Sequence, residues 1–266
     1  MYSFNYHKPA SLEEAAALFR NADDGMYLAG GQTLIPTMKQ RLAAPSDVID
    51  LAGVAGLAAI EVSDRQVSVG AFARHAEVAG HQGIRRALPV LAHLAAQIGD
   101  GQVRNRGTLG GSVANSDPAA DYPAAVIGLG ATVHTSSRAI AADDYFQDLF
   151  ETALEPGEII TRIDFPVPDR AAYRKFSHPA SRYAVVGVLI ADFDGDIRVG
   201  ITGAGPCAFR GTAIEQALNG SLDPAALQSV EVPDAGFNSD LFASAEYRAH
   251  LVKVMARRAL QDLLGA

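Results

Sequence analysis

The most informative part of this 266-residue sequence reads NRGTLGGSVAN, residues Asn105–Asn115. Its paired glycines, Gly110 and Gly111, allow backbone conformations closed to other residues and let the main chain approach a ligand without an intervening Cβ. Thr108 and Ser112 add hydroxyl groups beside the backbone amides. Such a segment is suited to hold a diphosphate, above all in a protein that offers few basic side chains there.

A second glycine pair occurs nearer the N-terminus, in LAGGQTL, residues Leu28–Leu34. It lies between a predicted short strand, Met26–Ala29, and a predicted helix, Leu34–Arg41, and Thr33 again supplies a hydroxyl group. Neither segment contains G-x-G-x-x-G or G-x-x-x-x-G-K-[ST], so the parallel dinucleotide-binding fold and phosphoryl transfer are both poor matches. One Gly-Gly pair is usually an ordinary tight turn, but two pairs flanked by hydroxyl and amide groups favour a bound ligand.

The longer glycine segment continues as SDPAAD, residues Ser116–Asp121. Pro118 fixes the chain directly after Asp117, and Asp121 follows four residues later. An acidic residue before proline is often only the entry to a helix. The functional alternative is that one or both carboxylates accept hydrogen bonds from ribose or ribityl hydroxyl groups.

Composition restricts the classes of function. The formal net charge of -8, from 22 basic and 30 acidic residues, argues against nucleic acid as the main ligand, because phosphate neutralisation needs a basic surface. The single cysteine, Cys207, allows neither an intramolecular disulfide nor a thiolate cluster. If the protein handles electrons, its redox centre is therefore organic or lies in a partner.

The histidines form no metal-like pattern and fall outside both glycine segments, so no metal site and no catalytic side chain is predicted. All seven are expected to be surface or structural residues: His7, His75, His81, His93, His134, His178 and His250. No apolar run reaches the roughly 18 residues that span a bilayer, and Met1–Tyr6 lacks the features of a signal peptide. The expected compartment is the cytoplasm.

Hydrophobic periodicity and turn residues predict a chain of mixed helices and strands. Ser11 is the predicted N-cap of a helix over Leu12–Asn21, with Glu14 as its capping-box partner. The pattern of predicted elements changes near residue 170. After this point Asp194-Gly195 predicts a β-hairpin, which is followed by predicted helices. The remaining expected strands are Val48–Leu51, Ala58–Val62, Gln66–Gly70, Thr132–Thr135 and Ile159–Phe165, and the remaining expected helices are Ala76–Gly80, Leu88–Ile98, Ala124–Ala131, Thr212–Leu218, Pro224–Ser229 and Ala245–Leu264.

Two long motifs in a fixed order, Ala29–Thr33 and Asn105–Asp121, resemble the medium, FAD-binding subunit of the xanthine dehydrogenase and carbon monoxide dehydrogenase family of molybdenum hydroxylases. Further similar segments are Phe4–Pro9, Pro45–Leu51 and Leu154–Ile160, so the resemblance covers nearly the whole chain. It implies an α+β fold whose FAD-binding domain has two parts, of the vanillyl-alcohol oxidase (PCMH-like) type, followed by a small α+β C-terminal domain. The implied division is residues 1–170, with subdomains of about 1–52 and 53–170, and residues 171–266.

The resemblance also implies which residues bind FAD. The diphosphate would lie on the Ala29–Thr33 turn and on Thr108–Ser112, with the carboxylates near the hydroxyl groups and the adenosine side. Three further residues match positions near the flavin ring in relatives, although a surface lysine and a half-buried strand aromatic are the plain alternatives for the last two. The complete expected set is Ala29, Gly30, Gly31, Gln32, Thr33, Leu34, Thr108, Leu109, Gly110, Gly111, Ser112, Asn115, Asp117, Asp121, Ile159, Lys175 and Tyr183.

In relatives of this kind, a molybdenum-pterin centre in a large subunit oxidises the organic substrate, and two [2Fe–2S] clusters in a small subunit carry the electrons to the flavin. The resemblance therefore implies an electron-transfer flavoprotein within a heterotrimer, which passes electrons to NAD, oxygen or a quinone. Two alternatives stay open from the residues. One is a stand-alone FAD-dependent oxidase or reductase, and the other is a non-catalytic nucleotide-binding module. The organic substrate is chosen in another chain.

Overall fold

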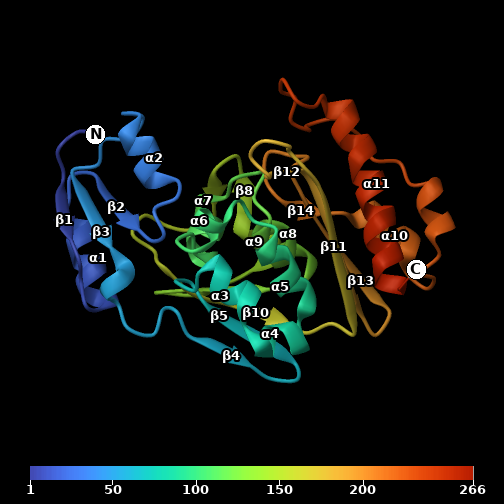
Figure 1. Cartoon of the computed structure of the whole chain (residues 1–266), viewed down its shortest axis with the longest axis horizontal. Coiled ribbons are helices and arrows are strands. Elements are labelled where there is room, and N and C mark those ends of the chain that lie inside the picture. The colour runs from blue at the N-terminus through green and yellow to red at the C-terminus, as the bar shows by residue number, and fades with distance from the viewer. Residues whose placement is uncertain (266) are drawn as a thin grey trace.

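Three sheet-containing units follow one another along the chain and lie side by side, with the N-terminal unit and the C-terminal unit on opposite flanks of the central one (Figure 1). The computed structural model describes residues 1–265. The strands are β1 (Asn5–His7), β2 (Gly25–Leu28), β3 (Asp47–Asp50), β4 (Ile60–Val62), β5 (Gln66–Gly70), β6 (Thr132–Thr135), β7 (Ala139–Ala141), β8 (Phe146–Asp148), β9 (Glu151–Thr152), β10 (Ile160–Pro166), β11 (Arg170–Ser177), β12 (Ala184–Phe193), β13 (Asp196–Thr202) and β14 (Phe209–Arg210). The α-helices are α1 (Leu12–Asn21), α2 (Leu34–Lys39), α3 (His75–Gly80), α4 (Gln82–Ala87), α5 (Pro89–Ala96), α6 (Gly101–Arg104), α7 (Leu109–Asn115), α8 (Tyr122–Gly128), α9 (Ala142–Tyr145), α10 (Thr212–Leu218) and α11 (Ala245–Leu264).

The N-terminal unit is a parallel three-stranded sheet in the order β1-β3-β2, packed against α1. The predicted N-cap of α1 is confirmed, because the Ser11 hydroxyl accepts a 3.2 Å hydrogen bond from the backbone N–H of Glu14. The Glu14 carboxylate accepts from Ala10 rather than from Ser11 itself, at 2.8 Å. The capping box is therefore displaced by one residue, yet two N–H groups at the helix start are still satisfied.

The central unit is an antiparallel sheet in the order β4-β5-β10-β6-β7, and helices α3 to α8 cover one of its faces. Val67 and Val69 on β5 and Ile163 and Phe165 on β10 point to the same side, because side chains alternate along a strand. They pack there with residues of the helices, including Leu91. Apolar burial on this one face accounts for the stability of the central unit.

The C-terminal unit is an antiparallel sheet in the order β11-β12-β13-β14, followed by α10 and the long helix α11. The predicted hairpin is confirmed, with positive φ at both Asp194 (53°) and Gly195 (90°) between β12 and β13. This pair of left-handed residues matches the right-handed twist of the strands. The first strand, β11, was not expected from the sequence, since its burial does not alternate regularly.

The central and C-terminal units share one continuous interior. Leu189 and Ala191 on β12 belong to the central core, whereas Val188 and Ile190, which alternate with them along the strand, pack in the core that includes α11. Helix α8 lies so close to β13 that a Cβ on Gly200 would stand 2.1 Å from the carbonyl oxygen of Ala124. The glycine is required by this close approach of a helix to a strand.

Most of the expected elements are present, with two differences of type. Residues Pro224–Gln228 form a 3-10 helix rather than an α-helix. The second glycine motif, expected to be a turn, becomes the first turns of helix α7 after Thr108. None of the helices within residues 1–265 is both long and apolar enough to cross a membrane.

Candidate FAD-binding site

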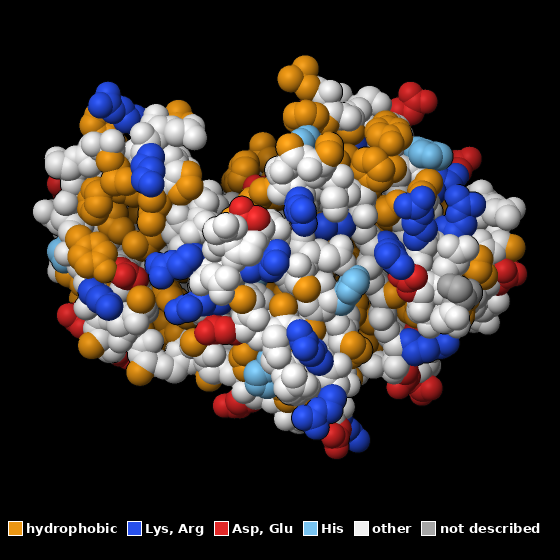
Figure 2. Space-filling model, in the orientation of Figure 1, with side chains coloured by type: hydrophobic (Ala, Val, Ile, Leu, Met, Phe, Trp, Pro, Cys, Tyr) orange, Lys and Arg blue, Asp and Glu red, His pale blue; other side chains and the backbone are white. Residues whose placement is uncertain are grey.

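A cavity of about 560 Å³ opens between the N-terminal and central units, where the surface is hollowed (Figure 2). Its volume falls within the roughly 300–1,000 Å³ typical of ligand pockets. The loop before β12 closes it from the side of the C-terminal unit. The expected site residues in its wall are Ala29, Gly30, Gly31, Gln32, Thr33, Leu34, Thr108, Gly110, Gly111, Ser112, Asn115, Asp117, Asp121, Ile159 and Tyr183.

The turn between β2 and α2 presents bare backbone amides to the cavity. Within residues 1–265 no protein group accepts a hydrogen bond from the N–H of any residue of Gly30–Thr33. Gly31 has φ of 70°, a conformation that glycine adopts at little cost. Gly30 touches the second motif, since a Cβ there would lie 2.2 Å from the carbonyl oxygen of Arg106. Consecutive unpaired N–H groups of this kind can bind an anion.

The second motif contributes differently from what its glycines suggest. The N–H groups of Leu109, Gly110 and Gly111 are already used, by the carbonyls of Ala73 and Ala71 and by the Thr108 hydroxyl. The expectation of free amides in both segments is therefore wrong for this one. Its glycines instead leave room, because a Cβ on Gly110 would stand 2.5 Å from the Cβ of Ala71.

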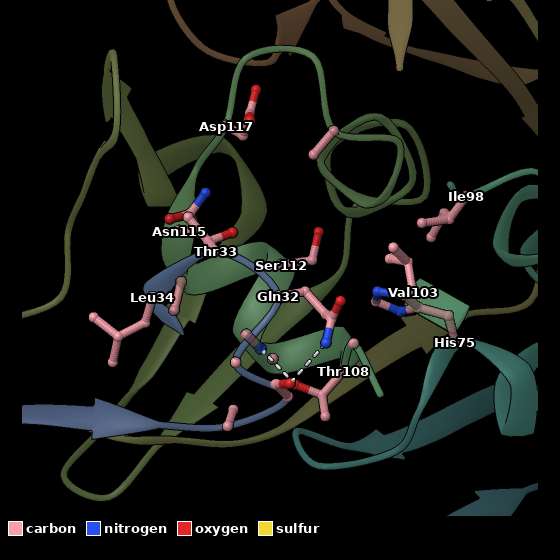
Figure 3. A pocket seen from close by; sticks show the side chains of 18 of the residues that line it. Gln32, Thr33, Leu34, His75, Ile98, Val103, Thr108, Ser112, Asn115 and Asp117 are labelled. Atoms are coloured by element: carbon pink, nitrogen blue, oxygen red, sulfur yellow. Dashed lines mark hydrogen bonds between the residues drawn. The ribbon is translucent and has the colours of Figure 1, made fainter. Parts of the chain in front are cut away.

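The second motif reaches the cavity through side chains. Figure 3 shows Ser112 and Asn115 of α7 on the same side of the cavity as Gln32 and Thr33 of the first turn. Leu109, in contrast, is fully buried in the central core and does not line the cavity. The two motifs thus form one polar wall, with main-chain donors on one strand-helix turn and side-chain donors on a helix.

The two carboxylates have different surroundings. Asp117 accepts one hydrogen bond, from the N–H of Ala119 at 2.9 Å, and burial raises its pKa. The Asp121 carboxylate accepts a hydrogen bond from the Tyr173 hydroxyl at 2.6 Å and forms an ion pair with the Lys175 ammonium group at 2.9 Å. Burial raises the pKa of Asp121, against the attraction of Lys175. Asp117 is consequently the carboxylate with free acceptor capacity toward a ligand.

Lys175 lies behind the cavity wall, and its side chain is only 2% exposed. Its ammonium group donates to Asp121, to the carbonyl oxygen of Gln97 at 3.1 Å and to that of Arg182 at 2.9 Å. Three acceptors match the three protons of an ammonium group. In this arrangement Lys175 fixes the loop that carries Tyr183, rather than lining the cavity.

Apolar and aromatic side chains also line the cavity. Ile159 is 3% exposed and Tyr183 is 44% exposed, and both line the cavity. Burial is the main reason that the pKa of the Tyr183 phenol is raised. A flat apolar group can pack against such a wall, while polar ends are bound at the glycine turn.

Several lining residues were not expected from the sequence, among them Tyr27, Phe72, His75, Glu158 and Arg182. His75 was expected to be a surface or structural residue, but it is 4% exposed and lines the cavity. No local pattern distinguishes these positions, because they come together only through the packing of the three units. Among the described residues, no group of His, Cys, Asp and Glu could hold a metal ion.

A family model described as "FAD binding domain in molybdopterin dehydrogenase" matches residues 2–168, more than half of the chain. The chain belongs to this family. Curated relatives of this FAD-binding family include the nicotine 6-hydroxylase medium subunit of Paenarthrobacter nicotinovorans, 36% identical over 274 residues that cover 98% of this chain and 97% of the relative. The carbon monoxide dehydrogenase medium chain of Afipia carboxidovorans is 34% identical, with 97% and 96% covered.

Solved structures place the same family fold on the whole chain. A chain of the reconstituted CO dehydrogenase from Oligotropha carboxidovorans aligns with a TM-score of 0.91 and 34% identity, covering 99% of this chain and 98% of that one. A chain of quinoline 2-oxidoreductase from Pseudomonas putida 86 aligns with a TM-score of 0.88 and 28% identity, covering 99% and 97%. The resemblance inferred from the two glycine motifs is confirmed, and the mixed α/β fold is that of CO dehydrogenase medium subunits.

The residues of the cavity fit FAD by their chemistry. A diphosphate needs several N–H or O–H donors, and the Gly30–Thr33 amides and the Ser112 hydroxyl supply them without a basic side chain. Ribose and ribityl hydroxyl groups need hydrogen-bond acceptors, and the Asp117 carboxylate has free acceptor capacity. The flavin ring needs a flat apolar surface, which Ile159 and Tyr183 can provide.

Proposed function

We propose that this chain binds one FAD non-covalently in the cavity and serves as the electron-transfer flavoprotein subunit of a molybdenum hydroxylase. The observation that supports this most is the run of unpaired amides at Gly30–Thr33, which forms one polar wall with Ser112 in a cavity of about 560 Å³. FAD supplies the redox chemistry, because it accepts electrons singly and releases them as a pair. The chain's own residues bind and orient the cofactor.

The proposed placement puts the diphosphate on the Ala29–Thr33 turn and beside Gly110–Ser112. Asp117 would accept hydrogen bonds from cofactor hydroxyl groups, while Ile159 and Tyr183 would pack near the flavin ring. The other residues of the expected set would shape the cavity. Leu34 and Asn115 complete the wall, and the two residues that do not line the cavity, Leu109 and Lys175, would fix its shape from behind.

Asp121 belongs to the same supporting group in this proposal. Its carboxylate joins the start of α8 to β11 through Tyr173 and Lys175, and Lys175 in turn holds the carbonyl oxygen of Arg182. The loop of Tyr183 is thereby tied to the central unit by a buried ion pair. Removing one partner of such a pair leaves an uncompensated buried charge. The shape of the flavin end of the cavity would depend on this pair.

The proposed architecture is the two-part FAD-binding domain of the vanillyl-alcohol oxidase type, residues 1–170, with parts of about 1–52 and 53–170. Residues 171–266 would be the C-terminal domain. The cavity supports this division, since its walls come from the turn after β2, from α7 and from the loop before β12. A cofactor at the junction of several parts is a common arrangement.

The partners we propose are a small subunit with two [2Fe–2S] clusters and a large subunit with molybdenum-pterin, together a heterotrimer in the cytoplasm. Several of the curated relatives are themselves called medium subunits or medium chains. No residue of the cavity is proposed as a nucleophile or as a general acid or base. The substrate would be oxidised in the large subunit, and the electrons would reach this chain through the small one.

The partner proposal is tested by isolating the tagged chain, with its genomic neighbours co-expressed, and measuring FAD, iron and molybdenum in the same fraction. The expected result is one FAD, four irons in two [2Fe–2S] clusters and one molybdenum for each copy of the chain. A chain carrying Gly30→Ala serves as a control that should lose FAD. Isolation of a flavin-containing chain with neither metal would contradict the relay function and favour a stand-alone flavoenzyme.

A further inference from the structure

His75 lies in the cavity wall, and its imidazole makes no hydrogen bond within the described part of the chain. It is 4% exposed, lies at the start of α3 and has no hydrogen-bond partner for Nδ1 within residues 1–265. Nε2 also has no hydrogen-bond partner in this part of the chain, and unlike Nδ1 it is not fully buried, so Nε2 is the nitrogen that a ligand in the cavity can reach. Figure 3 shows the ring projecting from the wall opposite Gln32.

The backbone holds this ring against the second glycine motif. The N–H of His75 donates to the carbonyl oxygen of Gly107 at 3.0 Å, and Arg74 and Thr108 form a β-bridge. The Nε2 atom of His75 lies where a side chain on Gly107 would stand, because a Cβ there would be 2.5 Å away. Gly107 is thus free of a side chain at the point where the imidazole passes into the cavity.

The other side of the ring is covered by an aromatic residue. The rings of His75 and Tyr122 lie 5.4 Å apart between centroids, with an interplanar angle of 53°. Tyr122 is fully buried, and its hydroxyl has no partner among the described residues. The imidazole therefore has one orientation fixed by packing, with Gly107 on one side and Tyr122 on the other.

Burial, and secondarily the nearby Arg104 guanidinium, lowers the pKa of His75 to about 4. A neutral imidazole carries one N–H donor and one acceptor nitrogen. With its proton on Nε2 the ring offers a donor toward the cavity, while the buried Nδ1 keeps its lone pair. The ring can then donate to an anion without being charged itself.

We propose that His75 is a cofactor-binding residue, which donates a hydrogen bond from Nε2 to an oxygen of the FAD diphosphate. This rests on the proposed function. The diphosphate is the acceptor favoured by position, since Gly107 and Thr108 precede the Gly110–Ser112 segment, and by charge, since hydrogen bonds to ionised acceptors are the stronger ones. His75 would complete the set of donors formed by the Gly30–Thr33 amides and Ser112.

The test compares three replacements in the full chain after removal of flavin, with FAD and with ADP as ligands. His75→Leu removes both nitrogens, His75→Asn keeps an amide near the position of Nδ1, and His75→Gln keeps an amide near that of Nε2. We expect both ligands to bind about tenfold or more weakly to the Leu and Asn variants, and His75→Gln to recover most of the affinity. His250→Gln, on the exposed face of α11, is the control and should match the wild type.

Equal weakening for FAD and ADP is the decisive result, because ADP carries the diphosphate and lacks the flavin. Weakening for FAD with unchanged ADP binding would overturn the proposal, and so would a Gln variant no better than the Asn variant. Unfolding midpoints of the ligand-free variants show which of them keep the fold, and the Asn and Gln pair can be compared at equal stability. A wild-type chain that binds neither ligand would contradict the proposed function itself, which is a different outcome.

Discussion

At the scale of single residues, the structure shows that the glycines of the two motifs have different structural roles. Gly31 is needed for its positive φ, whereas Gly30 and Gly110 are needed because another part of the chain lies where a Cβ would be. From the sequence, both pairs looked alike. Only packing shows that the unpaired amides occur at Gly30–Thr33, while those of Leu109–Gly111 are satisfied within the protein.

A substitution at Gly30 tests this contact. In Gly30→Ala the new methyl group would meet the carbonyl of Arg106, so we expect a loss of about 1–3 kcal/mol in the free energy of unfolding and a large loss of FAD affinity. Gly101→Ala is the matched control, since no atom lies within 4 Å of the place that its Cβ would take and the residue is helical. It should keep FAD and change stability by no more than about 1 kcal/mol. Denaturant unfolding and FAD titration measure both effects; equal behaviour of the two variants would contradict the account.

Glu158 provides a prediction about pH. Burial opposes its charge, but hydrogen bonds from Arg138, Thr135, Ser137 and the N–H of Glu155 lower its pKa from 4.5 to about 2. Because the folded pKa is depressed, the stabilisation is complete above about pH 4.5 and is lost as the pH falls toward 2. It is on the order of 2 kcal/mol, since Arg138 is 43% exposed and the pair is partly screened.

The measurement is the free energy of unfolding against pH for the wild type and for Glu158→Gln. The variant should be less stable at neutral pH, and the difference should shrink steadily between pH 4.5 and 2. A difference that stays constant over this range would show that the charge of Glu158 has no part in stability.

At the scale of elements, the sequence is most predictive where local signals agree with packing. Ser11 and Glu14 predict the first residue of α1, and Asp194-Gly195 predicts the hairpin turn, because each signal is a hydrogen bond or a φ preference within a few residues. The sequence is least predictive for β11 and for the start of α7. There the conformation depends on partners far along the chain, such as Ala71 and Ala73 for the amides of α7.

Helix α7 offers a test at this scale. The Thr108 hydroxyl accepts the N–H of Gly111 at 3.1 Å and is the N-cap of the helix. Thr108→Ala should cost about 0.5–2 kcal/mol in stability and weaken FAD binding, because the freed amide shifts the first turn of the helix. Thr108→Ser keeps the hydroxyl and should retain both properties. Urea unfolding with FAD titration checks the pair, and a Ser variant as damaged as the Ala variant would refute a capping role.

At the scale of the whole molecule, the site exists only because three units meet. Short glycine motifs identified the family and the polar part of the cavity wall, since each motif carries glycines, amides and hydroxyl groups close together in the sequence. They could not identify His75 or Tyr27, because residues of this kind reach the cavity from elements with no motif of their own. They also could not show that Lys175 lies behind the wall, which depends on its contact with Asp121.

The shared interior of the central and C-terminal units leads to a prediction for unfolding. Since Leu189 and Ala191 of β12 pack in the central core, we expect residues before and after 170 to unfold in one transition. Gly200→Ala, whose methyl group would meet the carbonyl of Ala124, should lower the stability of both units together, by about 1–3 kcal/mol or more. Gly80→Ala is the open-space control. Calorimetry that resolves two separate transitions would contradict a common core.

The most direct test of the whole account is a titration of the flavin-free, full-length chain with FAD, followed by removal of free ligand and acid release of what remains bound. We expect one FAD for each chain, a flavin absorption spectrum, and release of unmodified FAD by acid, since in the proposed site hydrogen bonds and packing alone would hold the cofactor. A folded chain that stays colourless with excess FAD, also in the presence of its iron–sulfur and molybdenum partners, would contradict the account.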